Sequence, residues 1–251
     1  ISRCISDAEV DSTDFNTGQG WGVNDTPGLG GIAVQNFGTI EYCVFKGKIA
    51  SGGKFGGYAG DSYGGIASGS DGVIRYCCNL GSVEGGAAAG IAGRINDYNE
   101  TPDAVVENCY NAGQISCGSG MLGGDVVGYT NYYYRTEKKE CQAGIRNCYF
   151  LSTSRNKGFD GSGYTDDGKT VKVTEDQLKC TESLEILSLL NQDSETSIFI
   201  KDLNNGNDGY PIFTWQGTPK MNNDAAAVSF TGVAQAETDL TADVQTELAY
   251  T

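Results

Sequence analysis

The chain has 251 residues, a formal net charge of −15, no histidine and 37 glycines. The acidic charge makes nucleic acids and anionic lipid surfaces poor partners, because like charges repel. The lack of histidine excludes Ser–His and Cys–His catalytic pairs, and no apolar stretch is long enough to cross a bilayer.

A short motif recurs five times from the first residue onward: an aliphatic residue is followed three places later by a cysteine. In the first four copies a small residue, a β-branched residue and then a glycine-rich aliphatic element follow the cysteine. A fixed local pattern with variable spacers predicts stacked structural repeats with loops inserted between short strands. The cysteines, spaced 39, 34, 32 and 39 residues apart, are Cys4, Cys43, Cys77, Cys109 and Cys148.

These repeats predict an all-β fold, and specifically a parallel β-helix (β-solenoid) of about five repeats over residues 1–165. Glycine bounds each short extended piece, and the repeats have no helical periodicity. Stacked repeats pair each strand with its equivalents above and below, which buries the apolar face that one repeat alone would expose. An aliphatic residue and a cysteine three places apart point to opposite faces of a straight strand. We therefore expect the chain to bend between them, so that both point inward.

The nine cysteines would ordinarily suggest disulfides or a metal site. In-register cysteines carry parallel side chains that are poorly aimed for a disulfide, so we expect the five ladder cysteines to be buried free thiols. Cys117 and Cys141 flank the glycine-rich strand and insertion of the fourth repeat, and could form a disulfide that staples it. The redox states of Cys78 and Cys180 are left open. A zinc site is the weaker hypothesis, because neither histidine nor a CxxC pair is present.

Two long insertions carry aromatic residues that we take as candidate ligand contacts. One runs from Asp11 to Pro27, and the other runs from Tyr129 to Gly144. Aromatic loops on a rigid scaffold are typical binding surfaces for proteins and glycans. The alternative is that the tyrosine run packs along the flank of the scaffold and shields it. The candidate contact residues are Trp21, Tyr132, Tyr133 and Tyr134.

Acidic residues near the predicted corners are the only material for a carboxylate active site. No mutual spacing fixes a catalytic pair among them, and such residues usually form solvated turns. The stretch from Asp202 to Asp208 superficially resembles a calcium loop, but it lacks the terminal glutamate of an EF-hand. A plain turn is favoured there, with a loosely held calcium ion as the alternative. We thus predict no catalytic residue, no cofactor and no metal site. The corner acids are Asp61, Asp71, Asp97, Asp103 and Asp125.

The segment after the repeats has a different composition. Between Leu151 and Lys169 it is rich in Ser, Asn, Gly and Asp, which predicts turns. A capping-box sequence begins at Thr174, and an amphipathic helix is predicted from Glu182 to Asn191, followed by strands. We expect residues 166–217 to form a small α+β cap laid across the last repeat, because that end would otherwise expose unpaired strand edges. Residues 218–251 are a linker or the start of a further module.

Three stretches of the repeats, together with the segment that follows them, carry a family resemblance. The stretches are GLGGIA at 28–33, VENCYNAGQI at 106–115 and IRNCYF at 145–150, and the ending is GYPIFTWQ at 209–216. They resemble the GLUG-motif repeats of secreted and cell-surface bacterial proteins, whose arrays often close with a similar terminal segment. The resemblance implies a surface-exposed stalk or adhesin-like module without an established catalytic activity.

The sequence therefore predicts a non-catalytic structural or adhesive module that binds a host or bacterial surface protein or glycan through its inserted loops. The alternative is a carbohydrate-active β-helix enzyme, either a polysaccharide lyase or a hydrolase, although a fold alone does not confer activity. We expect no binding of nucleic acid and no membrane insertion of this segment. Because residue 1 already lies inside a repeat motif, we expect a part of a longer precursor that is secreted or displayed at the cell surface.

Overall fold

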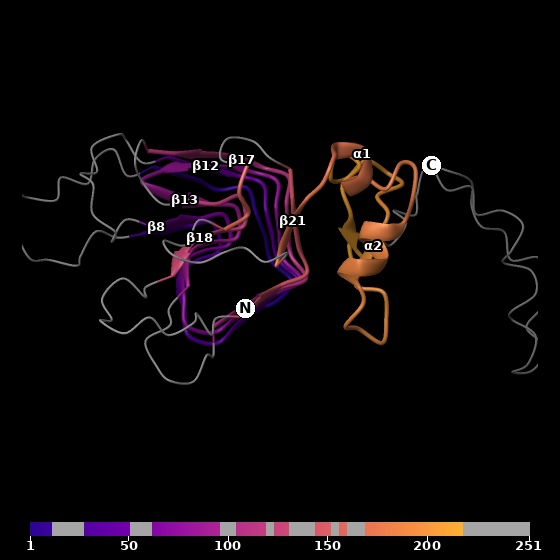
Figure 1. Ribbon diagram of the computed structural model, residues 1–251, viewed down its shortest axis with the longest axis horizontal. Coiled ribbons are helices and arrows are strands. Elements are labelled where there is room, and N and C mark those ends of the chain that lie inside the picture. Colours follow the sequence, from indigo (N-terminus) through magenta and orange to yellow (C-terminus); the bar gives the residue numbers. More distant parts are fainter. Residues whose placement is uncertain are drawn as a thin grey trace, which may run out of the picture.

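The structure is a computed structural model that describes residues 1–11, 28–50, 62–95, 104–118, 123–130, 144–151, 156–159 and 169–217. Within these ranges the chain is mostly β. Its strands are two to four residues long and form five parallel sheets and one antiparallel pair. The prediction of an all-β fold built from short parallel strands therefore agrees with the structure (Figure 1).

Each parallel sheet collects equivalent strands from successive repeats, and we name the sheets A to E in the order in which a repeat visits them. Sheet A comprises β5 (Thr39–Glu41), β10 (Val73–Arg75), β15 (Val105–Glu107) and β19 (Gly144–Arg146). Sheet B comprises β1 (Ile5–Ser6), β6 (Val44–Phe45), β11 (Cys78–Asn79), β16 (Tyr110–Asn111), β20 (Cys148–Phe150) and β21 (Thr170–Lys172). Sheet C comprises β2 (Glu9–Asp11), β7 (Lys48–Ala50), β12 (Ser82–Gly85) and β17 (Gln114–Cys117). Sheet D comprises β3 (Leu29–Gly30), β8 (Ser62–Gly64) and β13 (Ala87–Ala89). Sheet E comprises β4 (Ala33–Asn36), β9 (Ala67–Ser70), β14 (Ala92–Ile95) and β18 (Val127–Thr130).

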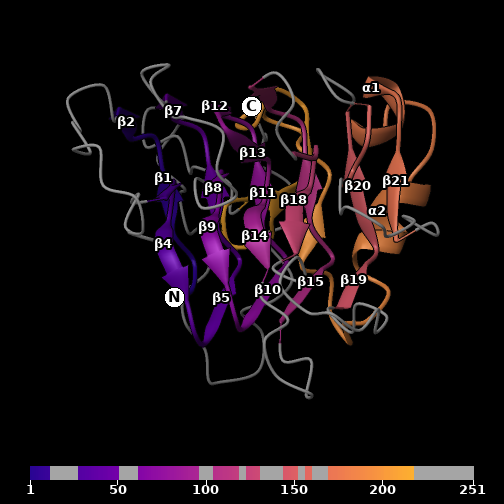
Figure 2. The same ribbon diagram turned by 60° about the vertical axis from the view of Figure 1, so that its left-hand side comes forward.

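Strands of successive repeats pair in register. In sheet A, Ile74 lies between Ile40 and Val106, and Val106 pairs in turn with Ile145. Figure 2 shows the consequence: strands of one sheet lie side by side in chain order, from the N-terminal repeat to the C-terminal repeats. Strands from successive copies of the sequence motif therefore pair with one another in sheet A.

The predicted bend between the aliphatic residue and the cysteine is confirmed. The residue immediately before each ladder cysteine has a left-handed backbone, with φ between 48° and 56°. This conformation costs a non-glycine residue about 1 kcal/mol or more, and asparagine tolerates it best. It turns the chain so that the aliphatic residue and the cysteine of one repeat, such as Ile74 and Cys77, lie in the same core. The corner residues are Arg3, Tyr42, Tyr76, Asn108 and Asn147.

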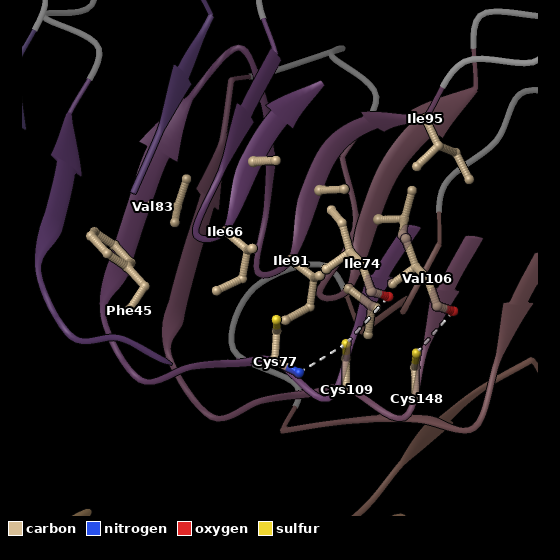
Figure 3. Packing of buried hydrophobic residues seen from close by; sticks show 14 of the residues in the cluster. Phe45, Ile66, Ile74, Cys77, Val83, Ile91, Ile95, Val106, Cys109 and Cys148 are labelled. Carbon is tan, nitrogen blue, oxygen red and sulfur yellow. Dashed lines mark hydrogen bonds between the residues drawn. The ribbon is translucent and has the colours of Figure 1, made fainter. Parts of the chain in front are cut away.

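The first core lies between the five sheets and consists of equivalent residues stacked from repeat to repeat. Figure 3 shows Cys77, Cys109 and Cys148 on successive repeats, pointing into the same interior as Ile74 and Val106. All five of these side chains are fully buried. Aliphatic, cysteine and glycine positions thus follow from one requirement, a dry interior that each repeat shares with its neighbours.

The glycine-rich element marks the corner between sheets D and E. A Cβ atom added at Gly64 would lie only 1.8 Å from the carbonyl oxygen of Ala67, and one at Gly65 would lie 2.3 Å from the oxygen of Gly90. Glycine is therefore required there by the close approach of neighbouring backbones. In the fourth repeat Asp125 occupies the place of Gly90 and is fully buried.

The C-terminal segment contains two short helices and the antiparallel strand pair. They are α1 (Glu175–Leu178), α2 (Glu185–Leu190), β22 (Phe199–Ile200) and β23 (Ile212–Phe213). The predicted capping box is present, because Thr174 and Gln177 each bond to the other's backbone N–H. The predicted helix over 182–191 is shorter than expected, since its regular part covers only α2.

The C-terminal segment lies only partly where the sequence suggested: its strand β21 pairs with β20 of the last repeat, but its helices and antiparallel strand pair pack elsewhere. A second core joins its apolar residues, such as Leu190 and Phe213, to the outer face of sheet B at Val44, Tyr110 and Tyr149. The segment therefore covers a flank of the repeats, and Figure 1 shows α1 and α2 to one side of the sheets, beyond β21. The reason is that the outward positions of sheet B are apolar in successive repeats, while the edge of the last strand in sheet B is paired by β21 itself.

Neither helix in the described ranges has the length and apolar character that crossing a bilayer requires. Residues 218–251, which the sequence suggests are a linker or a further module, lie outside the described residues.

Candidate functional site

The four aromatic residues predicted as ligand contacts, Trp21 and Tyr132 to Tyr134, lie outside the described residues. The strands on either side of their insertions are described, however, and these strands fix where each insertion leaves the scaffold.

The insertion that contains Trp21 connects the end of sheet C to the start of sheet D. It follows β2 and precedes β3, and residues 51–61 make the same connection in the next repeat, between β7 and β8. Because β2 pairs with β7 and β3 pairs with β8, the two insertions begin and end on neighbouring strands. We name this position the C–D corner.

The tyrosine-rich insertion leaves from another position. Residues 131–143 connect β18 of sheet E to β19 of sheet A, and residues 96–103 make the same connection between β14 and β15. These flanking strands are also paired, β14 with β18 and β15 with β19. We name this position the E–A corner. The two candidate insertions therefore join the scaffold at different strands.

A signal in the sequence could have shown this pairing of insertions. The distance from the leading aliphatic residue to the glycine-rich element is 31 and 26 residues in the first two repeats, but 17 and 20 residues in the next two. The extra residues therefore fall before the element in the early repeats and after it in the later ones. The lengths alone separate the C–D insertions from the E–A insertions.

The outer face of sheet A carries a row of alternating charges that the sequence reading missed. Glu41, Arg75, Glu107 and Arg146 occupy the same position in four successive repeats, and the register pairs each with the next. Arg75 Nη2 lies 2.7 Å from Glu41 Oε2, and Arg146 forms an ion pair with Glu107. The hydrogen bond to Glu41 raises the pKa of the Arg75 guanidinium. The row assigns these two glutamates a role in matching repeats, as opposite charges across strands favour one register.

Two of the five corner acids lie within the described residues, at different corners. Asp71 is in the turn between β9 and β10, where its Oδ2 accepts a hydrogen bond from Gln35 Nε2 at 3.3 Å. Asp125 lies between sheets D and E, is fully buried, and its backbone N–H donates to the carbonyl of Lys157 at 2.7 Å. The structure does not bring these two carboxylates to one corner. The other three, Asp61, Asp97 and Asp103, lie outside the described residues.

The stretch that superficially resembles a calcium loop is a turn held by its own backbone. The carboxylate of Asp202 accepts hydrogen bonds from the N–H groups of Gly206, Asn207 and Gly209 at 3.0, 2.7 and 3.1 Å. A positive charge is supplied by the chain itself, because Lys46 Nζ donates to the carbonyl oxygen of Gly206 at 2.8 Å. The Asp202 carboxylate thus stabilises the turn through backbone hydrogen bonds, and the stretch is the plain turn that the sequence favoured.

The ladder cysteines are free thiols. Cys43, Cys77, Cys109 and Cys148 are fully buried, while Cys4 in the first repeat is only half-buried. In each of the four buried residues the Sγ donates to the carbonyl two residues earlier, at 3.1 to 3.3 Å. Burial raises the pKa of the Cys109 thiol well above its usual range, so this residue is not a nucleophile at neutral pH.

The cysteines off the ladder fall into three situations. Cys78 and Cys180 are free and buried in or beside the second core, and burial raises the pKa of Cys78 to about 12. Cys117 is half-buried and its Sγ donates to the carbonyl of Ala88 at 3.3 Å, whereas Cys141, its suggested partner, lies outside the described residues.

Over the ranges that the structure describes, no three or more metal-ligating side chains gather into a group that could hold a metal ion. Comparisons of the chain with protein-family models, with curated proteins and with solved structures found no match.

Proposed function

We propose that the chain is a non-catalytic surface module in which a parallel β-helix displays inserted loops that bind a protein or glycan partner. The β-helix is supported by the in-register pairing of equivalent strands in every parallel sheet and by the repeated left-handed corner. We propose further that the module belongs to the GLUG-motif repeats and acts as a secreted or cell-surface adhesive element.

The observation that carries the binding proposal is the pairing of insertions at the two corners. Each insertion emerges from strands that are paired on the scaffold, so its ends are held in place before any partner binds. Fixed loop ends lower the ordering cost of binding, which favours loops on a rigid scaffold as recognition surfaces.

The E–A corner is the stronger candidate of the two. The insertion at residues 131–143 combines three tyrosines with Arg135, Lys138 and Lys139, whereas the neighbouring insertion at residues 96–103 carries three acids. Tyrosine beside both signs of charge suits partners that present hydroxyl groups and apolar faces together, such as glycans and folded proteins.

The test is a triple replacement of Tyr132, Tyr133 and Tyr134 by serine, compared with the unchanged chain on glycan arrays and in adhesion assays. We expect capture to be lost while the midpoint of thermal unfolding stays within about 2 °C, because the replaced residues lie in one insertion. Trp21→Ser at the C–D corner is the matched control, which should keep the capture made by the E–A corner.

Two results would oppose the proposal. Unchanged capture together with lower stability would mean that the tyrosines shield the scaffold. Cleavage of a polysaccharide by the pure chain, abolished by one change such as Asp97→Asn or Asp103→Asn, would instead favour the carbohydrate-active enzyme.

A further inference from the structure

Three polar side chains form a short chain of hydrogen bonds along sheet E. Gln35 of β4 and Arg94 of β14 occupy the same position in the sheet, on either side of Gly69 in β9. Arg94 Nη2 lies 3.5 Å from Gln35 Oε1, and Gln35 Nε2 donates to Asp71 Oδ2 at 3.3 Å. Figure 2 shows the three strands side by side. We name Gln35, Asp71 and Arg94 the sheet E cluster.

The contact between Arg94 and Gln35 depends on glycine in the strand between them. A Cβ atom added at Gly69 would lie 2.4 Å from Gln35 Oε1 and 3.2 Å from Arg94 Nη2. A side chain at this position would therefore push the two polar groups apart. All three members of the cluster are half-buried, so each also presents part of its side chain at the surface.

The carboxylate of the cluster sits in a turn that the scaffold holds firmly. The backbone N–H of Asp71 donates to the carbonyl of Asn36 at 2.8 Å. In the same corner Asn36 Nδ2 donates to Ser70 Oγ at 2.9 Å and to the carbonyl of Val73 at 3.2 Å. Ser70 is fully buried and Asn36 nearly so. The turn is thus fixed in advance, which lowers the ordering cost of binding a ligand.

The cluster has hydrogen-bonding capacity to spare. Arg94 Nε and Asp71 Oδ1 are buried, and neither has a hydrogen-bond partner among the described residues. A buried donor or acceptor without a partner is costly. Both contacts of Gln35 are longer than the usual separation of about 3.0 Å, so its amide is held weakly and can give way to a ligand. A ligand that brings one acceptor and one donor would satisfy both atoms.

The spare groups match the hydroxyls of a neutral sugar. A hydroxyl both donates and accepts, so two adjacent hydroxyls on a sugar ring can donate to Asp71 and accept from Arg94. The two charges of the cluster balance each other, whereas the whole chain carries −15. An acidic sugar would therefore be repelled, by Asp71 at short range and by the chain as a whole.

We propose that the sheet E cluster is a binding subsite for one neutral sugar unit of a glycan, held by Asp71 and Arg94 through adjacent hydroxyls. The subsite borders the E–A corner, because Asp71 lies between β9 and β10 and Arg94 lies two residues before the insertion at residues 96–103. The inference rests on the proposed function, since it takes a glycan as the partner that the E–A corner binds.

The first test is titration calorimetry of the full chain with neutral oligomers of glucose, mannose and galactose, and with oligomers that contain uronate. Arg94→Lys keeps the positive charge but loses the Nε donor, so we expect binding of the neutral oligomer to weaken about tenfold. Arg146→Lys, the same change at an exposed position in sheet A, is the matched control and should bind as the unchanged chain does.

Asp71→Asn gives a second test that a misfolded variant would not mimic. It removes the negative charge and one acceptor, so the neutral oligomer should bind less tightly. The ratio of the two affinities should also shift about tenfold in favour of the uronate oligomer, because the local repulsion is gone. Asp193→Asn, at an exposed position in the C-terminal segment, is the matched control and should leave the ratio unchanged. Circular dichroism checks that each variant is folded.

The outcomes separate this subsite from the proposed function. Glycan capture that is lost on replacing Tyr132 to Tyr134 by serine, but kept in Arg94→Lys and Asp71→Asn, would leave binding to the loops and overturn the subsite. Weaker binding in the two cluster variants alone would support the subsite and oppose the role of the tyrosines. A chain that binds none of the neutral oligomers, or that prefers the uronate oligomer without mutation, would also overturn the subsite.

Discussion

Asn147 connects two neighbouring repeats and α2 through one side chain. It occupies the left-handed corner of the last repeat, with φ of 52°. Its Nδ2 donates to Asn108 Oδ1 at 2.8 Å and to the carbonyl of Leu189 at 2.6 Å, and its Oδ1 accepts from Tyr149 Oη at 2.6 Å. The same residue therefore turns the chain, joins neighbouring repeats and holds α2.

Replacing Asn147 by alanine should lower the free energy of unfolding by about 3 kcal/mol, because hydrogen bonds are lost and alanine is strained at positive φ. Asn147→Gly loses the same hydrogen bonds, but glycine is not strained at positive φ. Its loss in free energy of unfolding should therefore be about 1 kcal/mol smaller than that of Asn147→Ala. Urea unfolding of the two variants measures the difference. Equal losses would show that the corner stores no backbone strain.

At the scale of elements, the row of alternating charges in sheet A complements the buried ladders. The apolar ladder would accept several slipped pairings, because Ile and Val are similar in shape. Arg75 lies between Glu41 and Glu107 in register, so a slip by a whole repeat would bring like charges together. The row of charges thus helps to specify which repeats pair, because burial of similar aliphatic side chains discriminates little between pairings.

Arg75→Glu should destabilise the fold by about 1 kcal/mol at low salt, since three glutamates would then be adjacent. Arg75→Gln removes the attraction without adding repulsion and should cost less than half as much. The gap between the two variants should narrow at high salt, because exposed charges are screened. A gap that salt leaves unchanged would point to packing as the cause.

Sequence patterns predicted the repeats, the bend and the ladder, because each depends on residues a few places apart. The spacing of Ile74 and Cys77 already required a turn between them. The place of the C-terminal segment could not be predicted in this way. It depends on Val44, Tyr110 and Tyr149 meeting Phe213 across long stretches of chain, and no local pattern records such a contact. For the C–D and E–A corners, the only signal in the sequence is the length of the spacers between the repeated motifs.

At the scale of the whole molecule, the second core fastens the C-terminal segment to several repeats at once. The ring of Phe213 stacks on that of Phe199, with 4.8 Å between the ring centroids, and packs edge-on against the ring of Tyr42, with 6.3 Å between the centroids. Tyr110, from another repeat, donates its hydroxyl to the carbonyl of Pro211 at 2.5 Å. Side chains from different repeats thus converge on one strand pair.

Phe213→Ala should loosen this segment without opening the first core, at a cost of about 3 kcal/mol. Thiol labelling under native conditions separates the two cores, because Cys78 lies in the second and Cys109 in the first. We expect Cys78 to react faster in the variant while Cys109 stays protected. Equal acceleration at both thiols would mean that the cores open together. Phe37→Ala, at an exposed position, is the control that should change neither rate.

The flank packing also bears on how the molecule would respond to tension. Hydrogen bonds between repeats point along the stacking direction, so a pull along that line would load them one repeat at a time. The second core spans several repeats along this direction. Val44, Cys78, Tyr110 and Tyr149 belong to four successive repeats and are all covered by the C-terminal segment. Peeling one of these repeats away would require the covering segment to release it first, so the flank acts as a brace against stepwise unravelling.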